Sequence, residues 1–146
     1  MRAMAGGCFC GAKRYVAQVE SVDAYLCHCR MCQRITGNVS IAFTSIRKAD
    51  VRWEGTPDYL ASSPIARRGF CATCGTSLTF EFPDSEWIDL TVASFDDPSS
   101  FVPRHHYAAE SMHEAWIDTS TLPRKRSEDN ENVVKRWMEA CGKLPD

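Results

Sequence analysis

Three tight groups of cysteines constrain the fold of this chain more than any other feature of its sequence. Seven of the eight cysteines lie in a C-x-C motif at residues 8–10, a C-x-C-x-x-C motif at residues 27–32 and a C-x-x-C motif at residues 71–74. In a reducing compartment such clusters are more often metal ligands than disulfides. The grouping therefore predicts metal sites that tie distant parts of the chain together.

The expected location is the cytoplasm, which supports this interpretation of the cysteines. The start of the chain, MRAMAGG, lacks the apolar stretch of a signal peptide, and no apolar run approaches the roughly 18 residues that span a bilayer. A net charge of −2 and an isoelectric point near 6.1 give no bulk attraction for the phosphates of nucleic acids. We therefore expect neither a membrane nor a nucleic acid as a partner.

Short runs rich in β-branched and aromatic residues predict an antiparallel β domain from about residue 12 to residue 107. Glycine, proline, aspartate and serine separate these runs, as turns between strands require. The predicted strands lie in the segments KRYVAQV, VSIAFTS, VRWEG, DYLASS, ARRGF, SLTFEF and WIDLTVASF. With 146 residues, the chain is long enough for one such domain with its own core.

Two later segments fall outside this strand pattern. The segment FDDPSSFVPRHHYAAE contains two prolines that favour extended or turn geometry, and it predicts a loop that carries His105 and His106. The polar stretch PRKRSEDNEN predicts a linker. A short helix is predicted after it, with Asn130 or Asn132 as its N-cap and Gly142 just past its end.

The expected domain organisation follows from this order of segments. Residues 1–124 are expected to form a zinc-binding β domain, and residues 125–146 a linker and a helix packed on the same domain. The helix carries one apolar stripe at helical spacing, formed by Val133, Val134, Trp137, Met138 and Cys141. Such a stripe predicts packing on the sheet, with Cys141 as a small buried hydrophobe.

The first and last cysteine motifs are expected to share one metal ion. A C-x-x-C turn places the sulfurs of Cys71 and Cys74 within reach of one ion, and Gly75 relieves the backbone just after it. Such a half site needs a partner pair, which Cys8 and Cys10 supply between flanking glycines. Four thiolates complete the coordination of Zn2+ and leave no place for a substrate, so this site is predicted to be structural.

Three thiols then remain in the middle motif, those of Cys27, Cys29 and Cys32. Three protein ligands and one open position are typical of a catalytic zinc site. An extended C-x-C that enters a first helical turn would bring these sulfurs to a common point, with the His28 side chain pointing away. Closure by another histidine would make this a second structural site, and the candidates are His105, His106 and His113.

The three motifs in their order resemble one known family. The segments GCFCG, CHCRMCQRITG and FCATCGTSL, followed by FDDP, HHY and a tryptophan near LP, are similar to the glutathione-dependent formaldehyde-activating enzyme family, which is related to centromere protein V. The resemblance runs from about residue 6 to residue 124 and fills all seven cysteine positions of the family pattern. The motif set is specific, because three spacings and their order must coincide.

The resemblance implies a mainly β, β-tent-like fold with antiparallel sheets built around two zinc ions. It assigns a structural zinc to Cys8, Cys10, Cys71 and Cys74, and a catalytic zinc to Cys27, Cys29 and Cys32. These assignments agree with those drawn from the spacings alone. The resemblance also implies a carbon–sulfur lyase activity that joins formaldehyde with glutathione to give S-hydroxymethylglutathione.

A thiol such as glutathione is the expected ligand of the open zinc. Three cysteinates leave the site net negative, which favours a soft sulfur ligand over an aldehyde oxygen, and zinc binding lowers the pKa of a thiol. The two carboxylates of glutathione are expected to meet Arg34, Arg67 and Arg68. His106 is expected to move the proton when the thiol adds to the aldehyde, with His28 as a second candidate.

Two other functions fit parts of this pattern. A two-zinc binding module without turnover would have an occupied or occluded fourth ligand position at the middle motif. Methionine sulfoxide reduction, which uses a related fold, would need a free nucleophilic cysteine facing a pocket, and Cys141 is instead expected in a packing face. We therefore expect a zinc-dependent lyase-type enzyme, with the binding module as the alternative.

Overall fold

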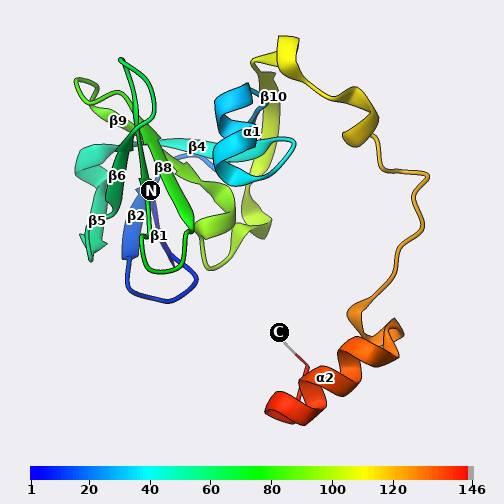
Figure 1. Cartoon of the computed structure of the whole chain (residues 1–146). Helices are drawn as coiled ribbons and strands as arrows, with labels where there is room; N and C mark the ends of the chain where they lie inside the picture. The colour runs from blue at the N-terminus through cyan, green and yellow to red at the C-terminus, as the bar shows by residue number, and fades with distance from the viewer. Residues whose placement is uncertain (145–146) are drawn as a thin grey trace. The chain divides into compact units, whose positions relative to one another are not determined.

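The computed structural model describes residues 1–144 and is built mainly from β-strands in two sheets, as expected (Figure 1). The strands are β1 (Arg2–Gly7), β2 (Arg14–Val19), β3 (Asp23–Cys27), β4 (Ile41–Arg47), β5 (Val51–Glu54), β6 (Asp58–Ala61), β7 (Arg67–Phe70), β8 (Ser77–Glu81), β9 (Trp87–Thr91) and β10 (Val102–Tyr107). The α-helices are α1 (Arg30–Thr36) and α2 (Glu131–Cys141). Short 3-10 turns cover Lys48–Asp50, Val92–Ser94, Pro98–Ser100, Ala109–Ser111, Glu114–Trp116 and Ser127–Asp129.

The topology of the two sheets decides where the cysteine motifs lie. One sheet has three strands in the order β1-β2-β5, and the other has seven in the order β10-β3-β4-β9-β8-β7-β6. Neighbouring strands run antiparallel except β10, which lies parallel to β3. The C-x-C-x-x-C motif begins with Cys27 at the end of β3, near one edge of the larger sheet. The C-x-x-C motif follows β7, near the opposite edge of the same sheet.

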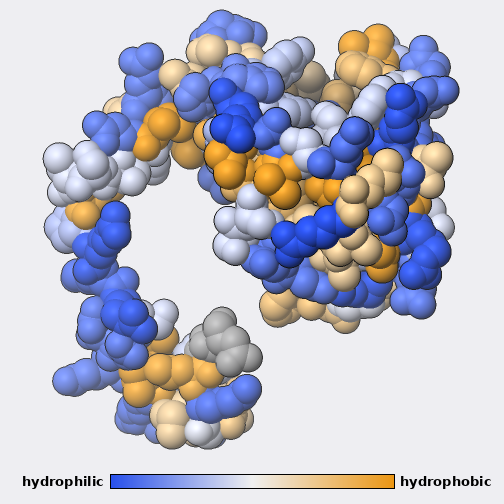
Figure 2. Space-filling model, turned by 180° about the vertical axis from the view of Figure 1, so that it is seen from behind, coloured by the Kyte–Doolittle hydropathy of each residue, from blue (hydrophilic) through white to orange (hydrophobic). Residues whose placement is uncertain are grey.

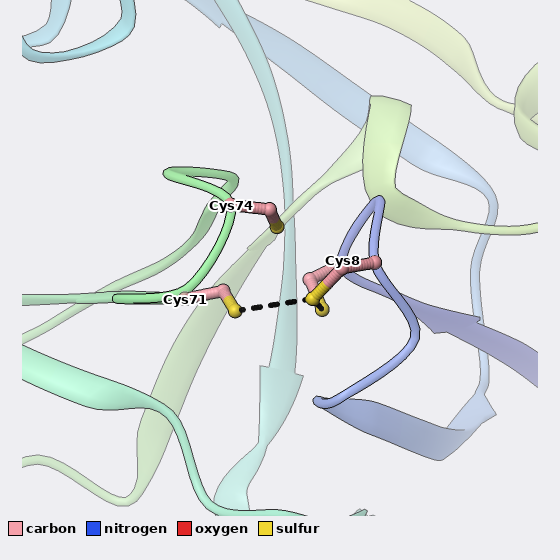
Figure 3. Close-up of side chains that lie close together, drawn as sticks. Cys8, Cys71 and Cys74 are labelled. Carbon is pink, nitrogen blue, oxygen red and sulfur yellow. Dashed lines mark hydrogen bonds between the residues drawn. The ribbon is translucent and has the colours of Figure 1, made fainter.

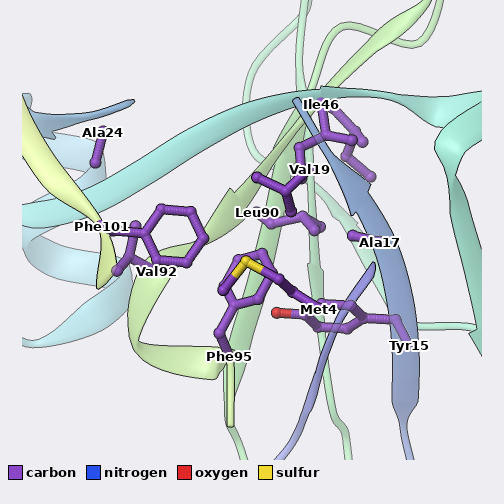
Figure 4. Close-up of a cluster of buried hydrophobic side chains, with 11 residues drawn as sticks. Met4, Tyr15, Ala17, Val19, Ala24, Ile46, Leu90, Val92, Phe95 and Phe101 are labelled. Atoms are coloured by element: carbon purple, nitrogen blue, oxygen red, sulfur yellow. The ribbon is translucent and has the colours of Figure 1, made fainter. Parts of the chain in front are cut away.

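A core of apolar side chains fills the β domain and holds β1 and β2 in place (Figure 4). Alternate residues of β2, Tyr15, Ala17 and Val19, are buried, as the two-residue period of a strand predicts. The ring of Tyr15 packs edge-on against Phe95 at 5.3 Å between centroids. Its hydroxyl lies 2.8 Å from the Ser94 hydroxyl, so its polar atom is satisfied inside the core. The hairpin of β1 and β2 thereby presents the first cysteine motif at a defined position.

The segment that carries His105 and His106 is a strand, so the predicted loop is wrong. Residues 102–107 form β10, which pairs with β3 at the end of the larger sheet. Proline lacks an N–H donor and is tolerated mainly at sheet edges and bulges. Pro103 meets both conditions, since β10 is an edge strand and its register shifts between Pro103 and His105.

Two further strands, β1 and β3, lie in segments where no strand was predicted. The segment of β1 is rich in alanine and glycine, which have low strand propensity.

The chain divides into two compact units, Met1–His113 and Glu114–Asp146. Both sheets belong to the first unit, and α2 belongs to the second. The predicted helix is confirmed: Asn130 caps it by accepting a hydrogen bond from the Val133 N–H, and Gly142 ends it at φ 72°. The boundary at residue 124 and the packing of the helix on the β domain stay predictions.

Apolar side chains are also found on the surface of the molecule. In the view of Figure 2, hydrophobic residues lie among hydrophilic ones on the exposed face. Exposed large hydrophobic residues of the first unit include Met31, Ile65, Phe82 and Tyr107. No helix in residues 1–144 has the length and the apolar character that crossing a bilayer would require.

Candidate metal centres

The first centre is a group of four thiols contributed by two loops. The Sγ atoms of Cys8, Cys10, Cys71 and Cys74 all lie within 4.8 Å of one another. Figure 3 shows Cys71 and Cys74 on one loop facing Cys8 on the other. All eight cysteines are free thiols, so no disulfide competes with metal binding at this centre.

Backbone geometry at each loop explains why the sulfurs converge. The Cys8 loop is a tight turn in which the Cys8 N–H donates to the Lys13 carbonyl at 2.8 Å and the Lys13 N–H donates to Cys8 Sγ at 3.2 Å. The Cys71 loop closes similarly, with the N–H of Gly75, at φ 79°, donating to the Cys71 carbonyl at 2.7 Å. The Phe9 N–H donates to Thr76 Oγ1 at 3.1 Å and joins the two loops.

Burial and protonation differ among the four thiols: Cys10 is exposed, and despite a hydrogen bond from the Ala12 backbone its pKa is raised to about 11 by the neighbouring Cys8 thiol. Cys71 is fully buried and packs with Cys8 and Leu78. Hydrogen bonding to Thr76 lowers the pKa of Cys74 to about 5, which favours the thiolate form that binds metal. Since these sulfurs come from segments about 60 residues apart in sequence, a shared ion would cross-link the first hairpin to the larger sheet.

The second centre is a group of three thiols from one continuous segment. Cys27 is the last residue of β3, Cys29 is the N-cap of α1, and Cys32 lies in its first turn. Their Sγ atoms lie within 4.8 Å of one another. The Cys29 sulfur accepts a hydrogen bond from the Cys32 N–H at 3.2 Å, so the helix N-terminus itself orients the group.

Hydrogen bonding within this centre sets the protonation of its sulfurs. Cys32 Sγ donates to Cys27 Sγ at 3.3 Å, which lowers the pKa of Cys27 and raises that of Cys32. A guanidinium nitrogen of Arg68 lies 3.3 Å from Cys32 Sγ. Arg68 is 4% exposed, so its positive charge acts on the thiols in a largely desolvated setting.

No histidine joins the three thiols within the part of the chain that the structure describes. His28 is completely buried, and its Nε2 lies 2.9 Å from Nδ1 of His106 on the neighbouring strand β10. Burial lowers the pKa of His28, with a smaller contribution from His106 and His113, so the neutral ring is favoured. The two rings therefore form a pair that adjoins the cluster through the backbone of Cys27 and Cys29.

The three-thiol centre opens on a cavity of about 420 Å³, hereafter the thiol cavity. Its walls are mostly apolar and aromatic. They are formed by Tyr25, Cys27, Cys29, Met31, Cys32, Phe43, Ser63, Ile65, Ala66, Arg68, Phe80, Phe82, Tyr107, Ala108 and Glu110. A cavity of this size beside the thiols provides room for a small molecule to reach them.

The three arginines expected to bind glutathione lie in different places. Only Arg68 lines the thiol cavity, where its guanidinium stacks 4.9 Å from the Phe80 ring centroid. Arg67 is the preceding residue of the strand and points to the other face, where it pairs with Glu81 at 2.9 Å. Arg34 is exposed on α1 and is absent from the cavity lining. The proposed catalytic residue His106 is likewise outside this lining.

Several residues of this site had no signal in the sequence. Gln33 is buried and its amide donates to the His28 carbonyl at 2.8 Å and to the Ser111 carbonyl at 3.1 Å, which fastens the cysteine segment to the turn after β10. The aromatic walls come from strands whose composition is ordinary for a β domain. Only their position in the larger sheet brings Phe43 and Phe80 to the thiols.

Comparison with known proteins adds a family match over most of the β domain. The model of the glutathione-dependent formaldehyde-activating enzyme family matches residues 3–111. An uncharacterized lyase of Schizosaccharomyces pombe is 32% identical over 81 residues, which is 56% of this chain. The matched region spans 59% of the length of that protein.

One solved structure is similar in fold. The crystal structure of a Rhodobacter sphaeroides protein, a structural genomics target, superposes with a TM-score of 0.59 at 23% identity. The match covers 71% of this chain and all of that chain. The same architecture therefore occurs in another protein of low sequence identity.

Proposed function

Because this chain belongs to the glutathione-dependent formaldehyde-activating enzyme family, we propose that it is a zinc-dependent lyase-type enzyme that adds a thiol to a small aldehyde. In the family reaction the thiol is glutathione, the aldehyde is formaldehyde and the product is S-hydroxymethylglutathione. The carbon–sulfur specificity, the two zinc ions and the substrates are parts of this proposal.

The observation that carries the proposal is the cavity at the three-thiol centre. Three sulfurs stand together without a fourth protein ligand in residues 1–144, and about 420 Å³ of space adjoins them. A closed structural site would instead surround its ion with four protein ligands. The alternative function, a binding module without turnover, is therefore less well supported by this geometry.

Both centres suit zinc by the chemistry of their donors. Thiolates are soft ligands that zinc prefers, and the sulfur positions lie close enough together to converge on one ion. Cys8, Cys10, Cys71 and Cys74 would hold the structural ion, and Cys27, Cys29 and Cys32 the catalytic one. A zinc ion bound at the second group would supply a Lewis acid and a position at which the pKa of a substrate thiol is lowered.

Residues of the chain are proposed to surround the reacting atoms, stabilise thiolate charge and transfer the proton. The walls around the thiols are mostly apolar, and the Arg68 guanidinium beside Cys32 stabilises thiolate charge. We assign proton transfer to His106, which is exposed to solvent and hydrogen-bonded to the buried His28 next to the cluster. The exposed His106 exchanges protons with water, and the hydrogen bond connects it to His28.

The proposal is tested by measuring zinc and the exchange reaction on the same protein. Protein purified without chelator is analysed for zinc, and the exchange of 13C-labelled formaldehyde with glutathione is followed by magnetisation-transfer NMR. We expect two zinc ions per chain and faster exchange than in buffer alone. Two zinc ions with no acceleration by any thiol would point to the binding module instead.

His106→Gln tests the assignment of the proton carrier. Glutamine keeps a polar group at this position but does not titrate, so we expect the rate of exchange to fall roughly 10²-fold with the zinc content unchanged. His113→Gln is the matched control, because the hydrogen bond of His28 is made with His106 and not with His113. An unchanged rate in His106→Gln together with a lower melting temperature would show a structural role for the pair.

A further inference from the structure

The walls of the thiol cavity do not match the polarity of glutathione. That tripeptide carries two carboxylates, an ammonium group and two amides, each of which needs a polar partner when it is buried. We propose that the thiol cavity binds the body of a small, apolar and uncharged thiol in preference to glutathione. This inference rests on the proposed function, since it names the class of thiol that the same site would use.

Aromatic side chains form the inner part of the cavity. Phe43 packs with the thiols of Cys27 and Cys32, and Phe80 lies against it at 6.4 Å between ring centroids. The hydroxyl of Tyr25 donates to the Asp89 carboxylate at 2.8 Å, so this polar atom is already engaged. A ligand at this depth therefore meets carbon surface on several sides, which favours an apolar body.

The mouth of the cavity is apolar as well. Four of its lining residues are large hydrophobic side chains that remain substantially exposed: Met31 at 47%, Ile65 at 69%, Phe82 at 43% and Tyr107 at 61%. Exposed apolar residues that gather around a hollow mark a binding site for apolar ligands more often than a solvated surface. They would gain buried area when an apolar thiol enters.

Charge within the cavity also disfavours carboxylates. A divalent ion held by three thiolates has one net negative charge, and the single positive charge of Arg68 balances it at 3.3 Å from Cys32 Sγ. Arg67 pairs with Glu81 and lines a neighbouring pocket instead, and the other charged lining residue, Glu110, is acidic and exposed. No cation in this lining is left to receive a substrate carboxylate, whose burial would be costly.

The reaction itself is unchanged by this choice of thiol. The S–H bond breaks, a bond forms between sulfur and the aldehyde carbon, and the carbonyl π electrons move to oxygen, which receives the proton. The product is a hemithioacetal, and atoms and electrons balance without any oxidant or reductant. Selectivity therefore lies in the thiol body that the cavity accepts.

Binding and reaction are measured separately, on zinc-loaded full-length protein. Binding is compared by calorimetry for two thioethers that cannot form a thiolate, benzyl methyl sulfide and S-methylglutathione. Reaction is compared by exchange NMR for the corresponding thiols, benzyl mercaptan and glutathione, with 13C-labelled formaldehyde. We expect the benzyl thioether to bind about tenfold more tightly or better than S-methylglutathione, and its thiol to react faster.

The outcomes separate this inference from the proposed function. Tighter binding of the benzyl thioether without acceleration of any thiol would support the apolar site and overturn the enzyme proposal. Equal or tighter binding of S-methylglutathione would overturn the apolar preference, whereas acceleration of glutathione would still support the enzyme.

A pair of surface variants locates the binding. Ile65→Asp places a charge at the exposed mouth of the cavity and is expected to weaken binding of benzyl methyl sulfide about tenfold. Leu60→Asp makes the same change at a residue that is 49% exposed and outside the thiol cavity, and it is expected to leave binding unchanged. Equal effects of the two substitutions would show that the thioether binds elsewhere and would overturn the proposal.

Discussion

The two cysteine centres of this domain have the same donor atoms, but they differ in where their ligands come from in the chain and in what lies beside them. The four-thiol centre joins two loops about 60 residues apart in sequence, and one of its ligands, Cys71, is completely buried. The three-thiol centre comes from a single stretch of six residues, from Cys27 to Cys32, and opens on the thiol cavity. One centre links parts of the fold, and the other presents sulfur to an adjacent space.

The comparison shows that the coupling of metal binding to folding depends on where the ligands lie in the sequence as well as on how many there are. Ligands from distant segments make metal binding part of folding, since the loops are held together only in the folded state. Ligands from a strand end and the following helix turn are arranged by local hydrogen bonds, such as the one from the Cys32 N–H to Cys29 Sγ. The position of such a group is therefore set largely by the backbone around it.

The sharpest test of this comparison is Cys71→Ser at the four-thiol centre. Loss of one ligand removes an ion whose binding is worth about 10 kcal/mol or more in structural sites, which is comparable with the whole stability of a domain. We expect the variant to lose cooperative thermal unfolding and to retain no zinc at this centre. A cooperative melt within a few degrees of the parent protein would show that this centre is not structural.

Cys29→Ser makes the corresponding change at the three-thiol centre. Serine is a good N-cap residue, so the bond to the Cys32 N–H and the start of α1 are preserved. We therefore expect one zinc ion fewer per chain and loss of thiol exchange, with a smaller loss of unfolding free energy than in Cys71→Ser.

The control for both serine variants is Cys141→Ser, which alters the one cysteine outside the two centres. It is expected to keep both ions and full exchange. Equal destabilisation by Cys29→Ser and Cys71→Ser would remove the distinction between the centres.

Arg68→Met tests the charge that accompanies the three-thiol centre. Methionine fills part of the space but lacks the positive charge beside Cys32, so thiolates are less stabilised and zinc is held less tightly. We expect zinc affinity at this centre to fall about 10–100-fold in competition with a chelator, with no change at the four-thiol centre. Arg47→Met is the matched control, because Arg47 also stacks on an aromatic ring, that of Trp87, away from both centres.

The smallest expected effect comes from a pair of glycines, one beside each centre. Gly75 and Gly37 have φ values of 79° and 66°, a conformation that costs an alanine about 1–2 kcal/mol. No neighbouring atom lies within 4 Å of a Cβ added at either position, so strain is the whole expected effect. Denaturant unfolding is expected to show similar losses of unfolding free energy for Gly75→Ala and Gly37→Ala.

Much of the candidate site could be read from the spacing of the cysteines. The C-x-C and C-x-x-C motifs predicted a shared group of four sulfurs, and the structure places those four sulfurs together. The C-terminal helix was also predictable, because its capping residues Asn130 and Gly142 act locally. Local geometry of this kind depends on few residues, so the sequence displays it directly.

The loop predicted over the histidines failed for the opposite reason. The prolines of that segment favour a break in regular structure, but pairing with β3 converts residues 102–107 into an edge strand. Strand formation there depends on a partner some 80 residues earlier in the chain. Such a dependence has no local signal.

The sequence by itself determined the donor groups, their division into four and three, and the β class of the fold. Only the tertiary structure decided that the second group faces a cavity, that its walls are aromatic, and that Arg68 rather than Arg67 or Arg34 lines it. The physical reason is distance along the chain. Metal ligands within a motif lie a few residues apart, whereas Phe43 and Phe80 meet the cysteines only because the order of strands in the larger sheet brings them together.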